Sequence, residues 1–405
     1  MGSRAKVPAS GGAGIQFSMT PDGRFVAFES AASNLVPGDT NGVGDVFVRE
    51  VASGVTTRVS LAYDGRQANA HSGVPSISAD GRFVVFESDA TNLVPGDTNQ
   101  ATDIYMRDRW TGQTTRVSVS AGGAQSQERN FAGQISGDGR VIVFVSAARN
   151  LVPDDTNFVQ DIFVRDRLAG TTTRASVPST AGQSDNDSFH PAVSADGRFV
   201  AFASIADNLV PRDTNGTTDV FVHDRQKRIT ERVSLTSSGA EAPTFNSAPS
   251  ISADGRFVAF QVNGGRLVPR DTNGVGDTYV RDRKKQTTTR VSVSSTGVQG
   301  NRASTFASIS ANGRFVAFDS FASNLVPGDT NGVNDVFIHD RWSRSTSRVS
   351  ISAAGAQANA ASALPMLSAA VTNDGRRAAF ASDATNLVPG DTNEIGDIFV
   401  RHLRR

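Results

Sequence analysis

One stretch of the chain occurs seven times, and this repetition limits the possible folds more than any other feature. Its Asp-Thr-Asn core begins at Asp39, Asp97, Asp155, Asp213, Asp271, Asp329 and Asp391. Successive copies are 58 residues apart, except for a last step of 62 residues. A fixed period of this size indicates one supersecondary unit stacked against copies of itself. We therefore expect a repeat architecture over the whole chain, not two or three unrelated domains.

Within one copy, the residues favour β-structure throughout. In the second copy, runs rich in Val, Phe and Thr predict strands at 75–78, 82–88, 103–108 and 114–120. The pair Asp80-Gly81 predicts a tight hairpin in which both turn residues have positive φ. Its carboxylate is then expected to serve backbone geometry, not chemistry. No stretch has a long helical period, so each copy should supply four short antiparallel strands.

Seven such copies predict an all-β fold, a seven-bladed β-propeller of four-stranded antiparallel blades in a single domain spanning residues 1–405. The two ends of the chain complement one another. The last copy stops after its third strand, whereas residues 4–8 align with residues 174–178 of a fourth strand. We expect the N-terminal strand, residues 4–9, to complete the blade formed by 367–402 and so remove an open sheet edge.

The segments Ser78–Ser88 and Asp103–Asp108 carry a family resemblance. The Asp-Gly turn, the apolar strand and the Asp-Ile-Tyr strand resemble the TolB-like, WD-repeat-like β-propeller repeat, and the first copy even has Pro21-Asp22-Gly23. The resemblance covers essentially the whole chain. It implies a propeller fold, and such propellers serve as protein-binding platforms, as gates on peptidases and occasionally as enzymes. This chain departs from the family in its longer period, with the extra residues mainly in the Asp-Thr-Asn loop.

Each loop carries Asp, Asn and Asp at relative positions 1, 3 and 7. Oxygen ligands at alternating positions of a Gly-rich turn can converge on Ca²⁺, so one hypothesis is up to seven calcium sites. The alternative is an Asx-turn, in which the same side chains bond to nearby backbone N–H groups. The triplets are Asp39/Asn41/Asp45, Asp97/Asn99/Asp103, Asp155/Asn157/Asp161, Asp213/Asn215/Asp219, Asp271/Asn273/Asp277, Asp329/Asn331/Asp335 and Asp391/Asn393/Asp397.

Composition and missing motifs narrow the function. Lys plus Arg and Asp plus Glu are 40 each, so no net charge would recruit nucleic acid or an anionic membrane. No apolar run is long enough for a membrane span, and the absence of Cys excludes thiolate metal sites. The chain has no Gly-x-Ser-x-Gly elbow and no His-Glu-x-x-His motif.

A unique ligand site would have to lie where the copies differ. The links between a fourth strand and the next first strand differ most, and they contain His71, Arg129, Asp187 and His190. These residues could bind a ligand near the central opening, or they could be ordinary surface variation. The leading hypothesis is a non-catalytic binding scaffold for a protein or a polysaccharide. It would be monomeric and secreted, periplasmic or in the cell envelope. The alternative is a carbohydrate-active enzyme or a lectin-like binder.

Overall fold

The computed structural model describes residues 16–180, 182–264, 266–362, 369–393 and 395–403. These residues form the seven blades of an antiparallel β-propeller, and the described residues contain no helix. Blades 1 to 6 have four strands each, in sequence order across the sheet, and blade 7 has three described strands. No helix among the described residues is long and apolar enough to cross a membrane.

The strands recur in the same order in every blade. The first strands are β1 (Phe17–Met19), β5 (Ser72–Ile77), β9 (Asn130–Ile135), β13 (Ser188–Val193), β17 (Asn246–Ile251), β21 (Ser304–Ile309) and β25 (Ala369–Val371). The second strands are β2 (Phe25–Ser30), β6 (Phe83–Ser88), β10 (Val141–Ser146), β14 (Phe199–Ser204), β18 (Phe257–Val262), β22 (Phe315–Ser320) and β26 (Arg377–Ser382). The third strands are β3 (Asp45–Glu50), β7 (Asp103–Asp108), β11 (Asp161–Asp166), β15 (Asp219–Asp224), β19 (Asp277–Asp282), β23 (Asp335–Asp340) and β27 (Asp397–His402). The fourth strands are β4 (Thr56–Arg58), β8 (Gln113–Arg116), β12 (Thr171–Arg174), β16 (Ile229–Arg232), β20 (Thr287–Arg290) and β24 (Ser345–Arg348).

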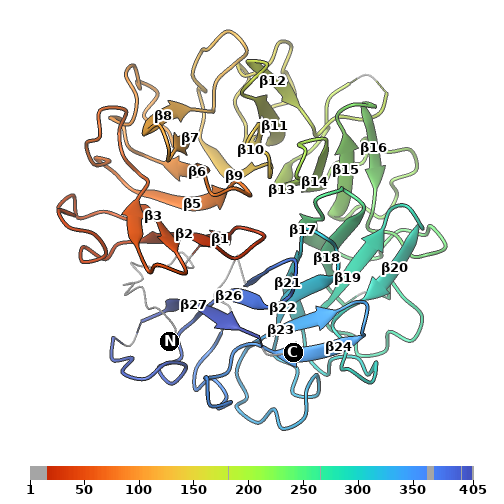
Figure 1. The fold of residues 1–405 in the computed structure, drawn as a ribbon. Helices are drawn as coiled ribbons and strands as arrows, with labels where there is room; N and C mark the ends of the chain where they lie inside the picture. Colours follow the sequence, from red (N-terminus) through yellow and green to blue (C-terminus); the bar gives the residue numbers. More distant parts are fainter. Residues whose placement is uncertain (1–15, 181, 265, 363–368, 394, 404–405) are drawn as a thin grey trace. The chain divides into compact units, whose positions relative to one another are not determined.

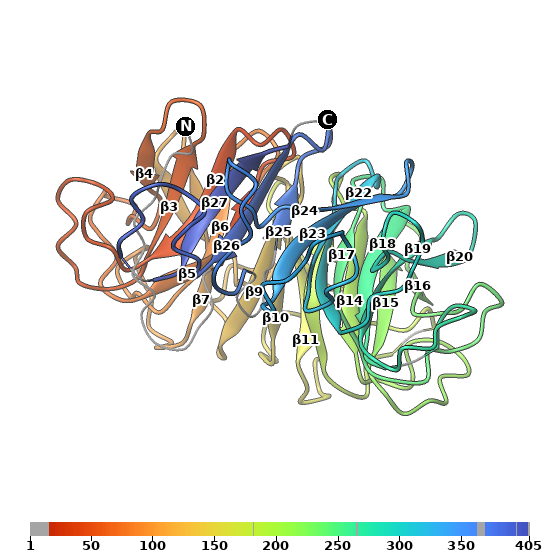
Figure 2. The same ribbon diagram turned by 90° about the horizontal axis from the view of Figure 1, so that it is seen from below.

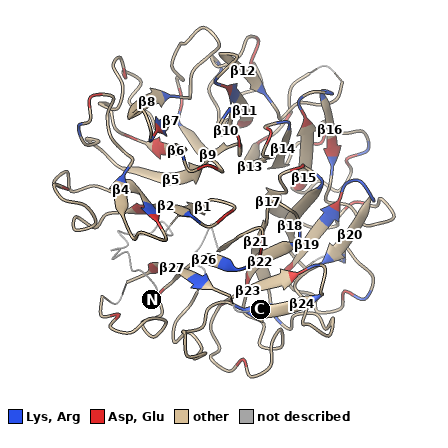
Figure 3. Ribbon diagram, viewed as in Figure 1, with Lys and Arg blue, Asp and Glu red and all other residues tan. Residues whose placement is uncertain are grey.

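The chain divides into two compact units, which are described separately. One holds residues 16–20 and 24–232, with blades 1 to 4, and the other holds residues 21–23 and 233–405, with blades 5 to 7. Within a unit, first strands of consecutive blades lie beside one another, as β5 and β9 do, and the fourth strands lie at the opposite edge (Figure 1). The strands of each blade twist against one another (Figure 2). Acidic and basic positions are interspersed along the blades (Figure 3).

In blade 2 the predicted strand boundaries can be compared with those of the structure. Its third strand has the predicted bounds, and its second strand begins one residue later than predicted. The first strand begins earlier, at Ser72, because a β-bulge between Gly73 and Ser76 extends the pairing. The fourth strand ends at Arg116 instead of residue 120, since the chain then turns back and pairs only through the isolated bridge of Val119 with Gln125.

The hairpin between the first two strands differs from the predicted two-residue turn. Only Gly81 has positive φ, at +74°, and its N–H donates to the carbonyl of Ser78. This is a four-residue turn with a left-handed residue at its end, which needs one glycine only. The Ser78 hydroxyl accepts from the Phe83 amide and donates to the Asp80 carboxylate. This carboxylate also accepts from the amide of Arg82. The prediction that this carboxylate serves backbone geometry is confirmed.

The apolar core lies between consecutive blades. Second and third strands are buried on both faces, which fits their nearly continuous runs of apolar residues. Phe86 and Tyr105 are fully buried and stack with ring centroids 6.1 Å apart. Phe25 of blade 1 belongs to the same apolar cluster as Val84 of blade 2. Each blade therefore depends on its neighbour for a dry face, as expected for a repeat that cannot fold alone. The predicted closing strand, residues 4–9, lies outside the described residues.

Candidate functional site

Each Asp-Thr-Asn loop joins the second strand of a blade to the third. The first Asp lies in the loop, and the second Asp is the first residue of the third strand, as Asp45 is in β3. This second position is fully buried in six blades and nearly so in blade 7. Burial raises the pKa of Asp45, Asp103 and Asp277, because the charged form loses hydration. A buried carboxylate at this place needs partners.

The main partner is the arginine that ends the fourth strand of the same blade. In blades 1 to 6 its guanidinium lies 2.8–3.3 Å from the first Asp and 2.6–3.6 Å from the second. The arginine side chains are less than a tenth exposed. The sets are Arg58 with Asp39 and Asp45, Arg116 with Asp97 and Asp103, Arg174 with Asp155 and Asp161, Arg232 with Asp213 and Asp219, Arg290 with Asp271 and Asp277, and Arg348 with Asp329 and Asp335.

The asparagine and a serine complete the network. In all seven loops the Asn Nδ2 donates to the second Asp, at 2.8–3.3 Å. The serine two residues after the arginine, such as Ser118, donates to the other carboxylate oxygen. The Asn Oδ1 of five loops accepts from the amide two residues on, which is an Asx-turn.

The observed role of the asparagines differs from the role that the calcium hypothesis gave them. As metal ligands they would direct Oδ1 toward the same point as the two carboxylates, but each turns Nδ2 toward the second Asp instead. An amide nitrogen is a hydrogen-bond donor and cannot ligate a hard cation. The asparagines that depart from the predicted ligand arrangement in this way are Asn41, Asn99, Asn157, Asn215, Asn273, Asn331 and Asn393.

The carboxylates also bear on the calcium hypothesis. Calcium requires six to eight oxygen atoms at about 2.3–2.6 Å, whereas the carboxylates of blades 1 to 6 face a guanidinium, an amide nitrogen and a hydroxyl. The cation that the loop holds here is an arginine. The residues in this arrangement do not fit Ca²⁺, which would have to displace the guanidinium and reorient the asparagine. Calcium binding at the triplets therefore stays a prediction, tested below.

A second recurring ion pair joins the end of the third strand to the start of the second strand. Asp108 at the end of the third strand pairs with Arg82 at the start of the second strand, through two bonds of 3.0 and 2.7 Å. The pair holds the pKa of Asp108 at about 2. Blades 3 to 6 repeat it as Arg140–Asp166, Arg198–Asp224, Arg256–Asp282 and Arg314–Asp340. The repeated charges are thus paired inside single blades.

The four candidate ligand residues divide into two groups. His71 lies 3.6 Å from Glu29 on β2, and Arg129 donates to Thr102, which in turn donates to Asp89. The charge of Arg129 also acts on Glu87 of β6. His71 and Arg129 are therefore each placed beside acidic residues of the preceding blade.

Asp187 and His190 have structural partners instead. Asp187 accepts from the amide of Gln160 at 2.8 Å. His190 packs edge-on against Phe189, and burial lowers its pKa. In the described part of the chain, no hydrogen bond or ion pair joins either residue to His71 or Arg129. The four residues do not form one contact network.

The structure adds a set of acceptors on the second strand. Glu87 accepts from the amide of Ala132, a residue with positive φ in the bulge of the next blade's first strand. Glu29 and Gln261 lie at the equivalent place in blades 1 and 5. Their side-chain oxygens accept from the amides of Val74 and Phe306, respectively. Burial raises the pKa of Glu87 to about 7. A polar residue in an otherwise apolar strand was the signal that could have identified this position.

Comparisons with known proteins identify the fold but do not assign the chain to a family. Neither a protein-family model nor a curated protein sequence matches the chain. An oligogalacturonate lyase solved in complex with manganese is 13% identical, with 96% of this chain and 88% of that chain covered and a TM-score of 0.58. The β-propeller domain of the Trilobed protease from Pyrococcus furiosus is 11% identical, with coverages of 96% and 95% and a TM-score of 0.54. TolB from Acinetobacter baumannii is 14% identical, with coverages of 96% and 79% and a TM-score of 0.41. At these identities the similarity to the lyase and to the protease domain shows a shared β-propeller fold alone.

Proposed function

We propose that this β-propeller is a non-catalytic binding scaffold, which takes a protein or a polysaccharide on surfaces that differ from blade to blade. The observation that carries the proposal is the pairing of the repeated charges. In blades 1 to 6 the recurring charged side chains pair with one another inside the blade, as Arg174 does with Asp155 and Asp161. These paired charges stabilise the blades, so a ligand would be recognised by the residues that vary from blade to blade.

Some of the variable positions expose large apolar side chains. Trp110, Phe158, Leu168 and Trp342 are all about two thirds exposed or more. They stand where other blades have small or polar residues, such as Gly42 in place of Phe158. Exposed aromatic side chains are typical anchors of binding surfaces. This supports a function in recognition.

The test compares binding with turnover. The purified chain is titrated with acidic and neutral oligosaccharides by calorimetry, and the saccharides are recovered and analysed by mass spectrometry. The proposal expects any bound saccharide to be recovered intact. Shortened or unsaturated products above the background of a heat-denatured sample would contradict it.

A carbohydrate-active enzyme is the second candidate, and Glu87 is the observation that favours it. A carboxyl group with a pKa of about 7 is suited to general acid or base catalysis near neutral pH. Glu87 also lies beside the charges of Glu29 and Arg129. Two fold neighbours are oligogalacturonate lyases. The competing explanation is structural, because Gln261 bonds to the amide of Phe306 from the same place without a titratable group.

The substitution Glu87→Gln separates these explanations. Gln keeps an acceptor for the amide of Ala132, as Gln261 does in blade 5, so the fold should survive. An enzyme that uses Glu87 would lose activity on oligosaccharides by about 10²–10⁴-fold while retaining its circular dichroism spectrum. Equal behaviour of the two proteins would exclude this role.

A further inference from the structure

A pocket of about 910 Å³ lies between blades 5 and 6, and one of its lining residues, His339, stands where most blades have arginine. The fifth residue of the third strand is Arg in most blades. Arg107, Arg165, Arg281 and Arg401 each donate to one or two backbone carbonyls of the preceding blade, at 2.5–3.4 Å. Blades 4 and 6 have His223 and His339 at this place. The shorter side chain of His339 bonds to Thr346 at 2.9 Å, as His223 does to Thr230, but makes no bond to the equivalent carbonyl, that of Ser294, in the described structure.

The hydrogen bonds of His339, a lining residue of the pocket, determine which ring nitrogen is left as an acceptor. The Thr346 hydroxyl donates to the carbonyl of Val293, so it must accept from His339 Nδ1. The neutral ring then carries its hydrogen on Nδ1 and leaves Nε2 as an acceptor. Burial keeps the ring neutral, with a pKa of about 4. The imidazole therefore favours a ligand that has hydroxyl groups.

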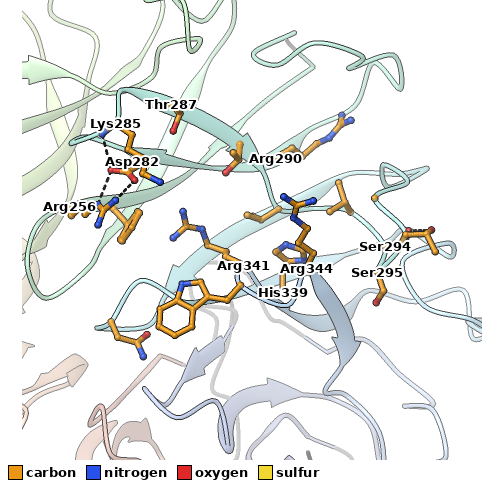
Figure 4. Close-up of a pocket in the computed structure, with 18 of the residues that line it drawn as sticks. Arg256, Asp282, Lys285, Thr287, Arg290, Ser294, Ser295, His339, Arg341 and Arg344 are labelled. Atoms are coloured by element: carbon orange, nitrogen blue, oxygen red, sulfur yellow. Dashed lines mark hydrogen bonds and ion pairs between the residues drawn. The ribbon is translucent and has the colours of Figure 1, made fainter.

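The same pocket carries an excess of positive charge. Arg256 is paired with Asp282, and Arg290 with Asp271 and Asp277. Lys285 and Arg344 have no ion pair with any described residue, and both line the pocket. Figure 4 shows His339, Arg341 and Arg344 of blade 6 across the pocket from Lys285 and Thr287 of blade 5. These unpaired cations favour an anionic ligand.

Arg344 occupies a backbone position that costs free energy. Its φ is +59°, a left-handed conformation that favours glycine. Blades 1 to 3 have Gly54, Gly112 and Gly170 at this turn position, with φ between +67° and +73°. Blades 4 and 5 have Arg228 and Gln286 in the same conformation, with φ of +56° and +55°. The turn therefore tolerates a long side chain, and the role of Arg344 rests on the pocket that it lines.

An aromatic wall adjoins these groups. Trp342 is 68% exposed, and the guanidinium of Arg314 lies 4.7 Å from its ring. Trp342 also lines the pocket. An indole beside cations and hydroxyl-bearing residues suits a sugar ring, whose C–H face is apolar and whose rim is polar. A free phosphate or sulfate would use the cations but would offer no C–H face to Trp342 and no donor to His339.

We propose that the pocket between blades 5 and 6 binds a carboxylate-bearing sugar residue, the end or a short stretch of an acidic saccharide. Arg344 and Lys285 hold the carboxylate, His339 accepts from a hydroxyl, and the ring packs on Trp342. This inference rests on the proposed binding function and assigns it a site and a ligand class. It does not require the saccharide to be cleaved.

The experiment is calorimetric titration of the whole chain with digalacturonate and with a glucuronate-containing disaccharide. The neutral disaccharide galactobiose and inorganic sulfate and phosphate are the control ligands. We expect one uronate site per chain, weaker binding at high salt, and much weaker binding of the neutral sugar and the inorganic anions. Equal binding of sulfate or phosphate would show a simple anion site and overturn the sugar assignment. No uronate binding at all would also overturn it.

Three variants locate the site. Arg344→Gly restores the glycine of blades 1 to 3, and His339→Arg restores the arginine that spans the gap in other blades. Each should weaken uronate binding by about tenfold or more, with no loss of thermal stability. Arg228→Gly is the matched control, because Arg228 occupies the same turn position in blade 4 with φ of +56°, where Gln226 replaces the tryptophan. Unchanged affinity in both pocket variants would overturn this site while leaving the binding function standing. Cleavage of the saccharide would instead contradict the non-catalytic function.

Discussion

At the scale of single residues, the arginine that ends each fourth strand is the clearest determinant of stability. Arg174 is 9% exposed and lies 3.3 and 2.6 Å from the carboxylates of Asp155 and Asp161. Removing one partner of a buried ion pair leaves uncompensated charge, which costs more than the pair itself contributes. The two aspartates would then face one another without a cation.

Arg174→Ala should therefore lower the free energy of unfolding by about 3–5 kcal/mol. Arg140→Ala in the same blade is the matched control. Arg140 is also paired with an aspartate, but its side chain is 47% exposed, so the midpoint of urea unfolding should change little. Equal shifts of the two midpoints would show that the buried network is not the stronger one.

Glu87 should give folding stability a distinct pH dependence. Burial raises its pKa from 4.5 to about 7, so ionising it costs more in the folded protein than in the unfolded chain. Its contribution is complete below pH 4.5 and is lost as the pH rises to about 7. Glu87→Gln should remove this loss, worth about 1–3 kcal/mol.

The measurement is urea unfolding of wild type and Glu87→Gln across this pH range. As the pH rises, the free energy of unfolding of the variant should increase relative to that of the wild type. Glu128→Gln, at an exposed position, is the control and should follow the wild type throughout. Parallel curves for wild type and Glu87→Gln would contradict the buried ionisation.

At the scale of elements, the hairpin tip of one blade is fitted to the preceding blade. Gly139 has φ of +72°, and a Cβ on it would lie 2.4 Å from the ring of Phe83. Gly96 has the same φ, but a Cβ there would meet no atom within 4 Å. The two glycines separate backbone strain from close packing.

Gly96→Ala should cost about 1 kcal/mol, which is the cost of the left-handed conformation alone. Gly139→Ala should cost a further 1–3 kcal/mol or so, since Phe83 must leave its packed position. Chemical denaturation of the two variants measures the difference. Equal losses would mean that neighbouring blades yield at this contact.

The Asp-Thr-Asn loop is the second element with a decisive test. If the guanidinium is its resident cation, melting curves in excess chelator and in millimolar calcium should coincide. A rise of the melting temperature in calcium, reduced by about one loop's share in the double variant Asp39→Asn, Asp45→Asn, would support the calcium hypothesis instead. Magnesium should then substitute poorly, because it demands a tighter octahedral geometry.

At the scale of the whole molecule, the seventh blade raises the question of closure. Its three described strands are β25, β26 and β27. Residues 4–8 resemble the fourth strand that contains Arg174, so Arg4 is predicted to serve Asp391 and Asp397 as Arg174 serves blade 3. Closure by the N-terminal strand stays a prediction, as do the monomeric state and the secreted or envelope location.

Deleting residues 1–9 should lower the melting temperature by several degrees, because an edge strand would lose its partner. Arg4→Ala should have a smaller effect in the same direction, and Lys6→Ala little effect. A melting curve unchanged by the deletion would show that these residues do not complete the blade.

The sequence alone determined the number of blades, the strand order and the positions of the third strands, because a repeated pattern of apolar strands and turns leaves few other ways to bury them. It also identified the Asp, Asn and Asp triplet of each loop as a recurring feature. Only the tertiary structure showed that Arg58 and its counterparts supply the cation, since residues 13–19 apart in sequence meet through the pairing of strands. The orientation of the Asn41 amide, with its nitrogen toward Asp45, was likewise decided by contacts that the loop sequence does not contain. The same holds for the pocket beside His339. Replacing Arg by His is a small change in the sequence, and its consequence appears only in the structure, where the His339 side chain does not bond to the preceding blade.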